Sequence, residues 1–354
     1  FDCLVGSEMC IRDSLNSTEI ERAETCLHLE GALEANDLTL QNCYIGLDVT
    51  GSATAEVDTL HVEQADVFAV RNKGTLDLLN QARLHNVSIG LQSEGATYVA
   101  DLEVEDALQG VKAVSGTASI HGLTATSNKI ALGASAGATL EAHDVTVRDS
   151  GLAVDASDAT SLTVDVLDVS TTGTLLQGRN VAGLSLSNVT ASISDGGAAT
   201  KAIDLPCSGT CHLSTASLAL DNATVHVSGS GTTGFTEVLL HAVNTTRPVL
   251  EATGTGTFDA DTMTVLGEGG VLFRDLDTSI QDMHVDLGQG EGPAVDLMAG
   301  DHVWGDVVLE RRYSAFDFSS QGLVARYATM HANALSATNL STGVHLDACL
   351  LYTS

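Results

Sequence analysis

Aromatic residues and proline are scarce in this sequence. Of its 354 residues only 4% are Phe, Trp or Tyr, and proline occurs three times. A core without aromatics has to be filled by Ala, Val, Leu and Ile, which suits a narrow interior in which short side chains stack. With so little proline, almost every backbone N–H is available for a β ladder. No apolar run approaches about 18 residues, so no membrane-spanning segment is expected.

Basic residues are also few. The chain has 15 Lys and Arg against 46 Asp and Glu, a formal net charge of −31. Nucleic-acid partners are therefore not expected, because phosphates are bound by Lys and Arg. Anionic membrane surfaces are disfavoured for the same reason. Divalent cations, cationic surfaces and neutral glycans remain compatible, although an acidic surface also simply keeps a long protein soluble.

One unit of 21 or 22 residues is repeated six times between Leu38 and Val166. Each unit has three short runs that alternate apolar and polar residues, and three such runs predict three strands and three turns. This is one coil of a parallel β-solenoid. The apolar positions that open the first run are expected to stack in one interior column. They include Leu38, Leu60, Leu102 and Val145.

The pattern in LTLQNCYIGLDV (38–49) and RLHNVSIGLQ (83–92) resembles the pectin-lyase-like superfamily. The resemblance implies an all-β, single-stranded right-handed parallel β-helix over 15–348, and parallel crossovers are generally right-handed. Asp or Asn precedes the first strand of many units, and such residues suit corners. These markers are Asp37, Asp58, Asp101, Asp144, Asp165, Asn188, Asn222, Asp261, Asp282 and Asp306. The spacing of these markers lengthens after Asn188, which predicts longer loops in 189–261, notably at 206–211 and 244–248.

The two ends of the chain resemble translated sequencing-adapter DNA. The segment LVGSEMCIRD (4–13) matches one reading frame of such an adapter, and CLLYTS (349–354) matches its reverse complement. Residues 1–14 and 349–354 are therefore interpreted as adapter-derived and are left out of the fold. They are expected to fray, although residues 350–352 could add a strand to the last coil. The 15–348 segment is then a fragment of a longer protein.

Six charged side chains are predicted to lie on one outward face of three adjacent coils. Carboxylates beside an Arg could support proton abstraction or glycoside cleavage, and polysaccharide-active members of the superfamily use such a face. The alternative is ordinary cross-strand ion pairs. The paired-Asp and Gly-His-Gly motifs of polygalacturonases are absent. We call this set the Arg83 patch: His61, Glu63, Arg83, His85, Glu103 and Glu105, of which all but His61 are also catalytic candidates.

Two histidines recur at the same coil position. His121 and His143 are 22 residues apart and should stack about 5 Å from each other. They could hold a metal together with Asp144, although such sites usually need three or four ligands. Calcium could be bound weakly by Asp144 and Asp165. The alternative is a surface histidine pair without a metal.

Four cysteines lie within 15–348. Cys207 and Cys211 bracket Ser-Gly-Thr, a spacing that suits a small disulfide and hence an oxidising compartment. Free thiols are the alternative. Cys26 and Cys43 fall at different coil positions, so a bond between them is not assumed.

These features together predict an extracellular or cell-surface β-helix scaffold. It would be adhesin-like or glycan-binding and would not be a catalyst. The alternative is a polysaccharide lyase or glycoside hydrolase. Apart from calcium, no cofactor is expected.

Overall fold

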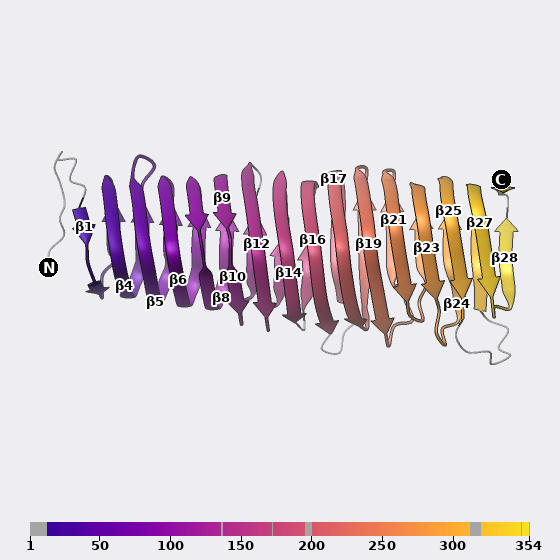
Figure 1. Ribbon diagram of the computed structural model, residues 1–354, viewed down its shortest axis with the longest axis horizontal. Helices are drawn as coiled ribbons and strands as arrows, with labels where there is room; N and C mark the ends of the chain where they lie inside the picture. The colour runs from indigo at the N-terminus through magenta and orange to yellow at the C-terminus, as the bar shows by residue number, and fades with distance from the viewer. Residues whose placement is uncertain are drawn as a thin grey trace.

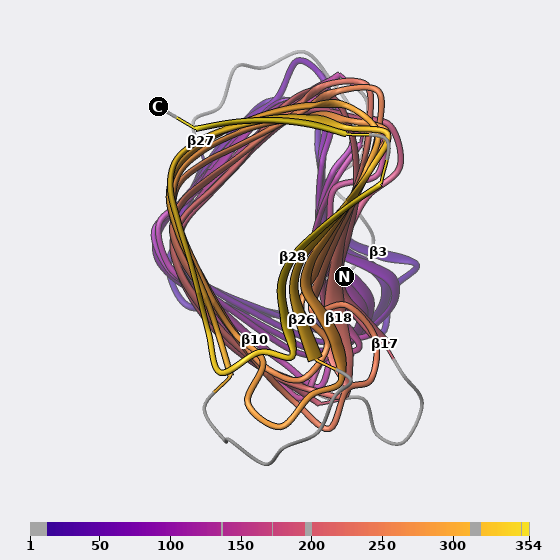
Figure 2. The same cartoon turned by 90° about the vertical axis from the view of Figure 1, so that its right-hand side faces the viewer.

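The computed structural model describes residues 13–135, 137–171, 173–194, 200–311, 320–347 and 349–353. The chain is an all-β parallel solenoid of about 14 turns, with coils of about 22 residues and no helix among these residues. Figure 1 shows the strands stacked side by side along the long axis, from the N-terminus to the C-terminus. Seen end-on in Figure 2, the coils superimpose around one shared interior. No helix in the described residues is long and apolar enough to cross a membrane.

All described strands belong to one parallel sheet. The strands of the first part of the rod are β1 (Asp13–Leu15), β2 (Thr18–Glu21), β3 (Thr25–Leu29), β4 (Ala32–Val49), β5 (Thr54–Asn72), β6 (Thr75–Ser93), β7 (Ala96–Val99), β8 (Leu102–Ala113), β9 (Gly116–Ile120), β10 (Leu123–Thr126), β11 (Ile130–Ala134), β12 (Ala138–Arg148), β13 (Leu152–Asp155), β14 (Ser161–Thr171) and β15 (Thr174–Gln177). The remaining strands are β16 (Val181–Ser194), β17 (Thr200–Asp221), β18 (Ala223–Gly229), β19 (Thr232–Val243), β20 (Leu250–Gly254), β21 (Thr257–Leu266), β22 (Val271–Arg274), β23 (Asp277–Asp286), β24 (Gly292–Met298), β25 (Asp301–Glu310), β26 (Ser320–Arg326), β27 (Thr329–Thr338), β28 (Thr342–Asp347) and β29 (Leu350–Thr353).

The predicted interior column is confirmed. Leu38 pairs with Leu60, and the column continues without a break to Val145. Its residues are at most 1% exposed. Since side chains alternate between the two faces of a strand, a slip of one residue would turn the whole column outward. The members in order are Leu38, Leu60, Ala82, Leu102, Leu123 and Val145.

The chain turns most regularly at a corner that the sequence analysis did not identify. One residue after the first strand of each early coil has a positive φ, between 49° and 58°. Asn and Asp tolerate this left-handed conformation better than most residues. Among the Asx residues expected at corners, Asp144 and Asn188 also have a positive φ, of 52° and 53°, whereas Asp37, Asp58 and Asp101 do not. The column of turning residues is Arg22, Asn42, Gln64, Asn86, Asp106, Ser127 and Asp149.

The loop expected at 206–211 is absent, because these residues lie inside β17. Val189 pairs with Ala216, 27 residues further on, so Asn222 does not mark the start of the coil's first strand. The register shifts between the Val181–Cys207 and Gly183–Thr210 pairs. The extra length is therefore taken up in part by a bulge in the strand.

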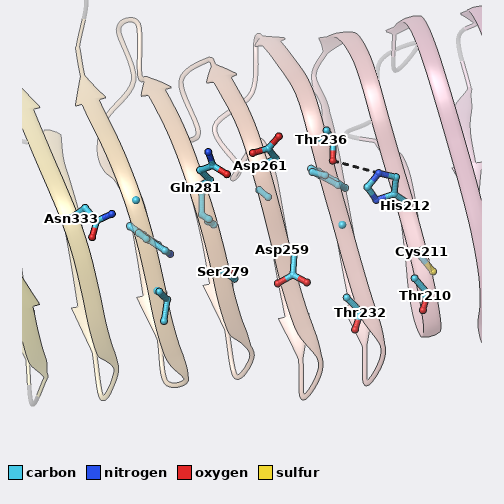
Figure 3. Close-up of a pocket in the computed structure, with 17 residues that line it drawn as sticks. Thr210, Cys211, His212, Thr232, Thr236, Asp259, Asp261, Ser279, Gln281 and Asn333 are labelled. Carbon is cyan, nitrogen blue, oxygen red and sulfur yellow. Dashed lines mark hydrogen bonds between the residues drawn. The ribbon is translucent and has the colours of Figure 1, made fainter.

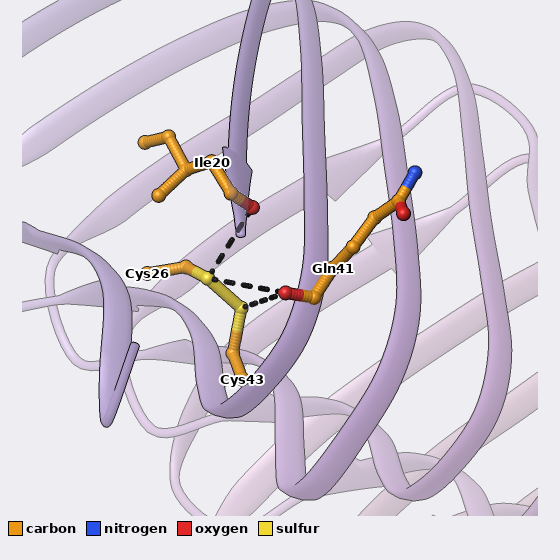
Figure 4. Close-up of a disulfide and its surroundings, with 4 residues drawn as sticks. All are labelled: Ile20, Cys26, Gln41 and Cys43. Atoms are coloured by element: carbon orange, nitrogen blue, oxygen red, sulfur yellow. Dashed lines mark hydrogen bonds between the residues drawn. A yellow bond between two sulfur atoms is a disulfide. The ribbon is translucent and has the colours of Figure 1, made fainter. Parts of the chain in front are cut away.

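Two disulfides hold local turns of the chain. Cys207 and Cys211 are joined across the bulge of β17, with their Cα atoms 6.1 Å apart. Cys26 and Cys43 are also joined, with Cα atoms 5.8 Å apart (Figure 4), a bond that the sequence pattern alone did not indicate. Cys43 follows the turning residue Asn42. At this corner Cys43 meets Cys26, although the two cysteines occupy different positions in the repeat. Position along the repeat therefore did not reveal the pair.

Both described ends add to the ladder. β1 pairs with residues 33–35 of β4, and β29 pairs with residues 329–332 of β27. An exposed strand edge can pair with any segment that has free backbone groups, so this pairing does not bear on the origin of the ends. Residues 1–12 of the predicted adapter segment lie outside the described residues.

Truncation of a column residue should destabilise the rod far more than truncation of an outward leucine. Leu60 is 1% exposed and Leu108 is 60% exposed. We expect Leu60→Ala to lower the free energy of unfolding by about 2–5 kcal/mol and Leu108→Ala by less than about 0.5 kcal/mol. Urea unfolding followed by circular dichroism measures both. Equal losses would contradict the assignment of the column.

Candidate functional site

The structure brings the six residues of the Arg83 patch together on three successive coils. His61 pairs with Arg83, and Arg83 pairs with Glu103. Two residues further along each strand, Glu63 pairs with His85 and His85 with Glu105. All six project outward because their neighbours along the strand form the interior columns.

Four side chains of the Arg83 patch are paired across neighbouring strands. Arg83 Nε lies 3.1 Å from Glu103 Oε2, and His85 Nδ1 lies 3.4 Å from Glu105 Oε2. The four side chains keep between 41% and 57% of their exposure. They are therefore hydrated contacts between neighbouring strands, of which Arg83–Glu103 is an ion pair, and such cross-strand pairs are each worth about 0.2–1 kcal/mol. Nothing in this geometry removes a carboxylate from water as a general acid would require.

Asp106 extends the patch in a way that the sequence analysis missed. The ligand atoms of His85, Glu105 and Asp106 all lie within 4.8 Å of one another. In the described chain this is the one group of three or more His, Cys, Asp or Glu side chains that meets this geometry. Asp106 is a turning residue with a φ of 55°, so its side chain returns toward the strand it follows. Attention to outward strand positions alone could not find it.

The histidine column forms as expected, but it does not gather a metal site. The rings of His121 and His143 are stacked with centroids 5.4 Å apart, and Tyr98 lies 5.2 Å from His121. His143 Nδ1 is 3.9 Å from Asp165 Oδ2. With Asp144, these residues do not form a trio of converging ligand atoms among the described residues.

Asp165 already has hydrogen-bond partners of its own. Ser187 Oγ and Asn188 Nδ2 both donate to Asp165 Oδ1 at 2.7 Å. These two hydrogen bonds hold the pKa of the Asp165 carboxyl below its ordinary value. Asp165 Oδ1 thus links this coil to the next one, and only Oδ2 faces His143.

A groove of about 580 Å³ lies on the outside of the C-terminal half of the rod. It crosses β17, β19, β21, β23, β25 and β27, and Figure 3 shows its polar side chains on successive strands. The outward positions Gly234, Ser279 and Gly305 leave it hollow, while Phe235 and Trp304 lie beneath it and are at most 2% exposed. The polar lining consists of Thr210, His212, Thr232, Thr236, Asp259, Asp261, Ser279, Gln281 and Asn333.

Gly234 is needed for the shape of the groove. A Cβ atom there would lie 2.7 Å from His212 Nδ1, so a side chain would collide with the imidazole ring. His212 Nε2 is 3.4 Å from Thr236 Oγ1, the contact dashed in Figure 3. The ring is thus held at one end of the groove.

The groove is acidic and contains one perturbed carboxyl. Asp259 and Asp261 alternate along β21 with the interior residue Ala260, so both face outward. Burial raises the pKa of the Asp259 carboxyl, because desolvation disfavours the charged form. None of the lining residues is Lys or Arg. The small outward residues Gly234, Ser279 and Gly305 could have indicated this groove from the sequence. They were not aligned with one another, because Asn222 was taken as the residue before the first strand of its coil, which begins at Ala216 instead.

A more strongly buried ion pair lies elsewhere, near the N-terminal end. Arg71 donates two hydrogen bonds of 2.7 Å to Asp48, and His28 Nδ1 lies 3.0 Å from Asp48 Oδ2. Asp48 is 5% exposed. Burial alone would raise its pKa, but the hydrogen bonds and charges of Arg71 and His28 outweigh it and hold the pKa below the ordinary value. These contacts join three successive coils, so their role is structural.

Comparison with protein-family models, with curated proteins and with solved structures gives no match. The molecule is therefore identified by its architecture. It is a parallel β-solenoid. A relation to the pectin-lyase-like superfamily stays a proposal.

The buried pair of Asp48 should make stability depend on pH. The pKa of Asp48 is lowered in the folded state from its ordinary value of 3.8. Asp48 therefore stabilises the fold at pH values above 3.8, and this contribution is lost as the pH falls through the folded pKa. We expect Asp48→Asn to cost about 3 kcal/mol at pH 7, and the difference from wild type to shrink in acid. Urea titrations over a pH series measure this. Asp168→Asn is the control, because its 2.7 Å pair with Arg148 is exposed.

Arg83→Ala should have only a small effect on stability. Its ion pair with Glu103 is exposed, and such pairs contribute at most about 1 kcal/mol. Arg71→Ala, which leaves the carboxylate of Asp48 buried without its main partner, should cost clearly more. Thermal and urea unfolding of the two variants provide the comparison. A larger loss in Arg83→Ala would contradict the description of the patch as hydrated.

Proposed function

We propose that this protein is an extracellular or cell-surface scaffold, a rigid β-helix that presents glycan-binding or adhesin-like surfaces and does not act as an enzyme. The observation that carries the proposal is the pairing in the Arg83 patch. Arg83 with Glu103 and His85 with Glu105 are matched across neighbouring strands and remain about half exposed. A catalytic site is expected to contain a desolvated group with a shifted pKa, whereas paired and hydrated charges suit a scaffold surface.

Two further features support the proposal. Disulfides at Cys26–Cys43 and Cys207–Cys211 suit an oxidising compartment such as the cell exterior. The acidic surface, with a net charge of −31, suits a soluble rod that avoids nucleic acid and anionic membranes. A distant relation to pectin-lyase-like proteins fits the same reading, since it rests on the coil pattern and carries no catalytic motif.

A polysaccharide lyase or glycoside hydrolase is the second candidate, and the groove favours it. Asp259 and Asp261 lie two residues apart on one strand and both face this groove, so their Cα atoms are about 6–7 Å apart. Glycoside hydrolysis uses a pair of carboxyl groups, one of them with a raised pKa. Asp259 has that property.

Polysaccharide turnover by the full chain separates the two functions. Neutral, amino and acidic polysaccharides are incubated with the protein, with and without calcium, and new reducing ends and unsaturated products are measured. We expect retention of a glycan without cleavage. Cleavage that disappears in Asp259→Asn or in Arg83→Ala would replace the scaffold by an enzyme and would locate its site.

A further inference from the structure

The groove has a marked charge preference. Its lining combines the carboxylates of Asp259 and Asp261 with hydroxyl and amide groups, and it contains no Lys or Arg. The described residues show no ion pair that involves either carboxylate. An acidic polysaccharide would bring like charges against these groups, whereas a cationic chain would pair with them.

The strands that carry the groove add further negative charge on both sides. Asp277 pairs in register with Thr257 of β21, and Asp282 pairs directly with Asp306. These carboxylates are exposed. Like charges directly opposite each other in a sheet are unfavourable, and a cationic ligand along this face would relieve that repulsion. The negative potential of these carboxylates therefore attracts a positively charged ligand to the groove.

The shape of the groove favours a glycan over a peptide. Its floor is an in-register ladder from β17 to β27, whose backbone groups already pair with the neighbouring coils. No free strand edge is offered for β-augmentation, and most of the lining side chains are polar rather than pockets for apolar anchors. Instead, each of β17, β19, β21, β23 and β27 contributes one or two polar side chains, while β25 contributes Val303, Trp304 and Gly305; neighbouring strands are about 4.8 Å apart. Polar groups spread over five of the six strands suit a hydroxylated polymer laid along the rod.

We propose that the groove binds a polysaccharide bearing free amino groups, laid across β17 to β27 with its ammonium groups against Asp259 and Asp261. The inference rests on the glycan-binding function proposed above and specifies its ligand class. Hydroxyl and amide groups such as those of Ser279 and Gln281 would bind the sugar hydroxyls. Polymers of uronic acids would be excluded by charge.

Calorimetric titration of the full chain tests the ligand class. The probes are a linear glucosamine oligosaccharide, its fully N-acetylated counterpart and an oligogalacturonate. We expect the glucosamine oligosaccharide to bind about tenfold more tightly than the acetylated one, with an affinity that falls as salt is added. The oligogalacturonate should not bind. Equal affinity for the first two probes, or preference for the acidic one, would overturn the inference.

Substitutions locate the binding. Asp259→Asn with Asp261→Asn should weaken the glucosamine oligosaccharide about tenfold, whereas Asp66→Asn with Asp101→Asn removes the same charge far along the rod and should change nothing. Ser279→Lys places a cation at an exposed groove position and should abolish this binding. Circular dichroism checks that each variant is folded. An unchanged affinity in the groove variants, or an equal loss in the distant one, would contradict the site.

The two proposals fail in different ways. If no glycan binds, the glycan-binding function and the inference fail together. If only uncharged or acidic glycans bind, the function stands and the ligand class is wrong. Tighter binding of an oligolysine peptide than of the glucosamine oligosaccharide would assign the groove to basic peptides and overturn the inference.

Discussion

Each coil is held to the next by the backbone hydrogen bonds of a parallel ladder, and every other feature depends on this contact. Parallel strands in register place equivalent residues directly beside each other. Inward positions therefore become continuous apolar columns such as the one through Leu60, which is buried together with Leu38. The burial and the ladder enforce the same register, because a slip would expose the columns. Stability is then a sum of contacts between neighbouring coils.

The same register turns the outer face into rows of adjacent side chains. Where opposite charges fall in one row, as at Arg83 and Glu103, they form hydrated pairs that need no pocket. Where carboxylates and small residues fall together, as at Asp259 and Ser279, the row becomes a polar groove. The two halves of one rod therefore differ in their surface chemistry although they share one backbone arrangement.

Corners follow a different rule from strands. A strand position is set by period-2 burial, but a corner needs only one residue able to adopt a positive φ. Asn42 and Asp106 adopt a positive φ at a small cost. Arg22 and Gln64, whose residue types lack that preference, adopt it as well. Because the surrounding ladder over-determines the turn, sequence markers of corners are unreliable here. Of the Asx residues expected before the first strand, Asp144 and Asn188 adopt a positive φ, whereas Asp37 and Asp58 do not.

The sequence by itself determined the repeat, the solenoid architecture, the interior column and the row containing Arg83 and His85. In-register stacking converts spacing along the chain into adjacency in space, so these features need no further information. Only the tertiary structure decided the Cys26–Cys43 bond, the bulge in β17 and the groove at Asp259. Each depends on where the chain turns or shifts register. Such shifts arise from the packing of whole coils and leave no period in the sequence.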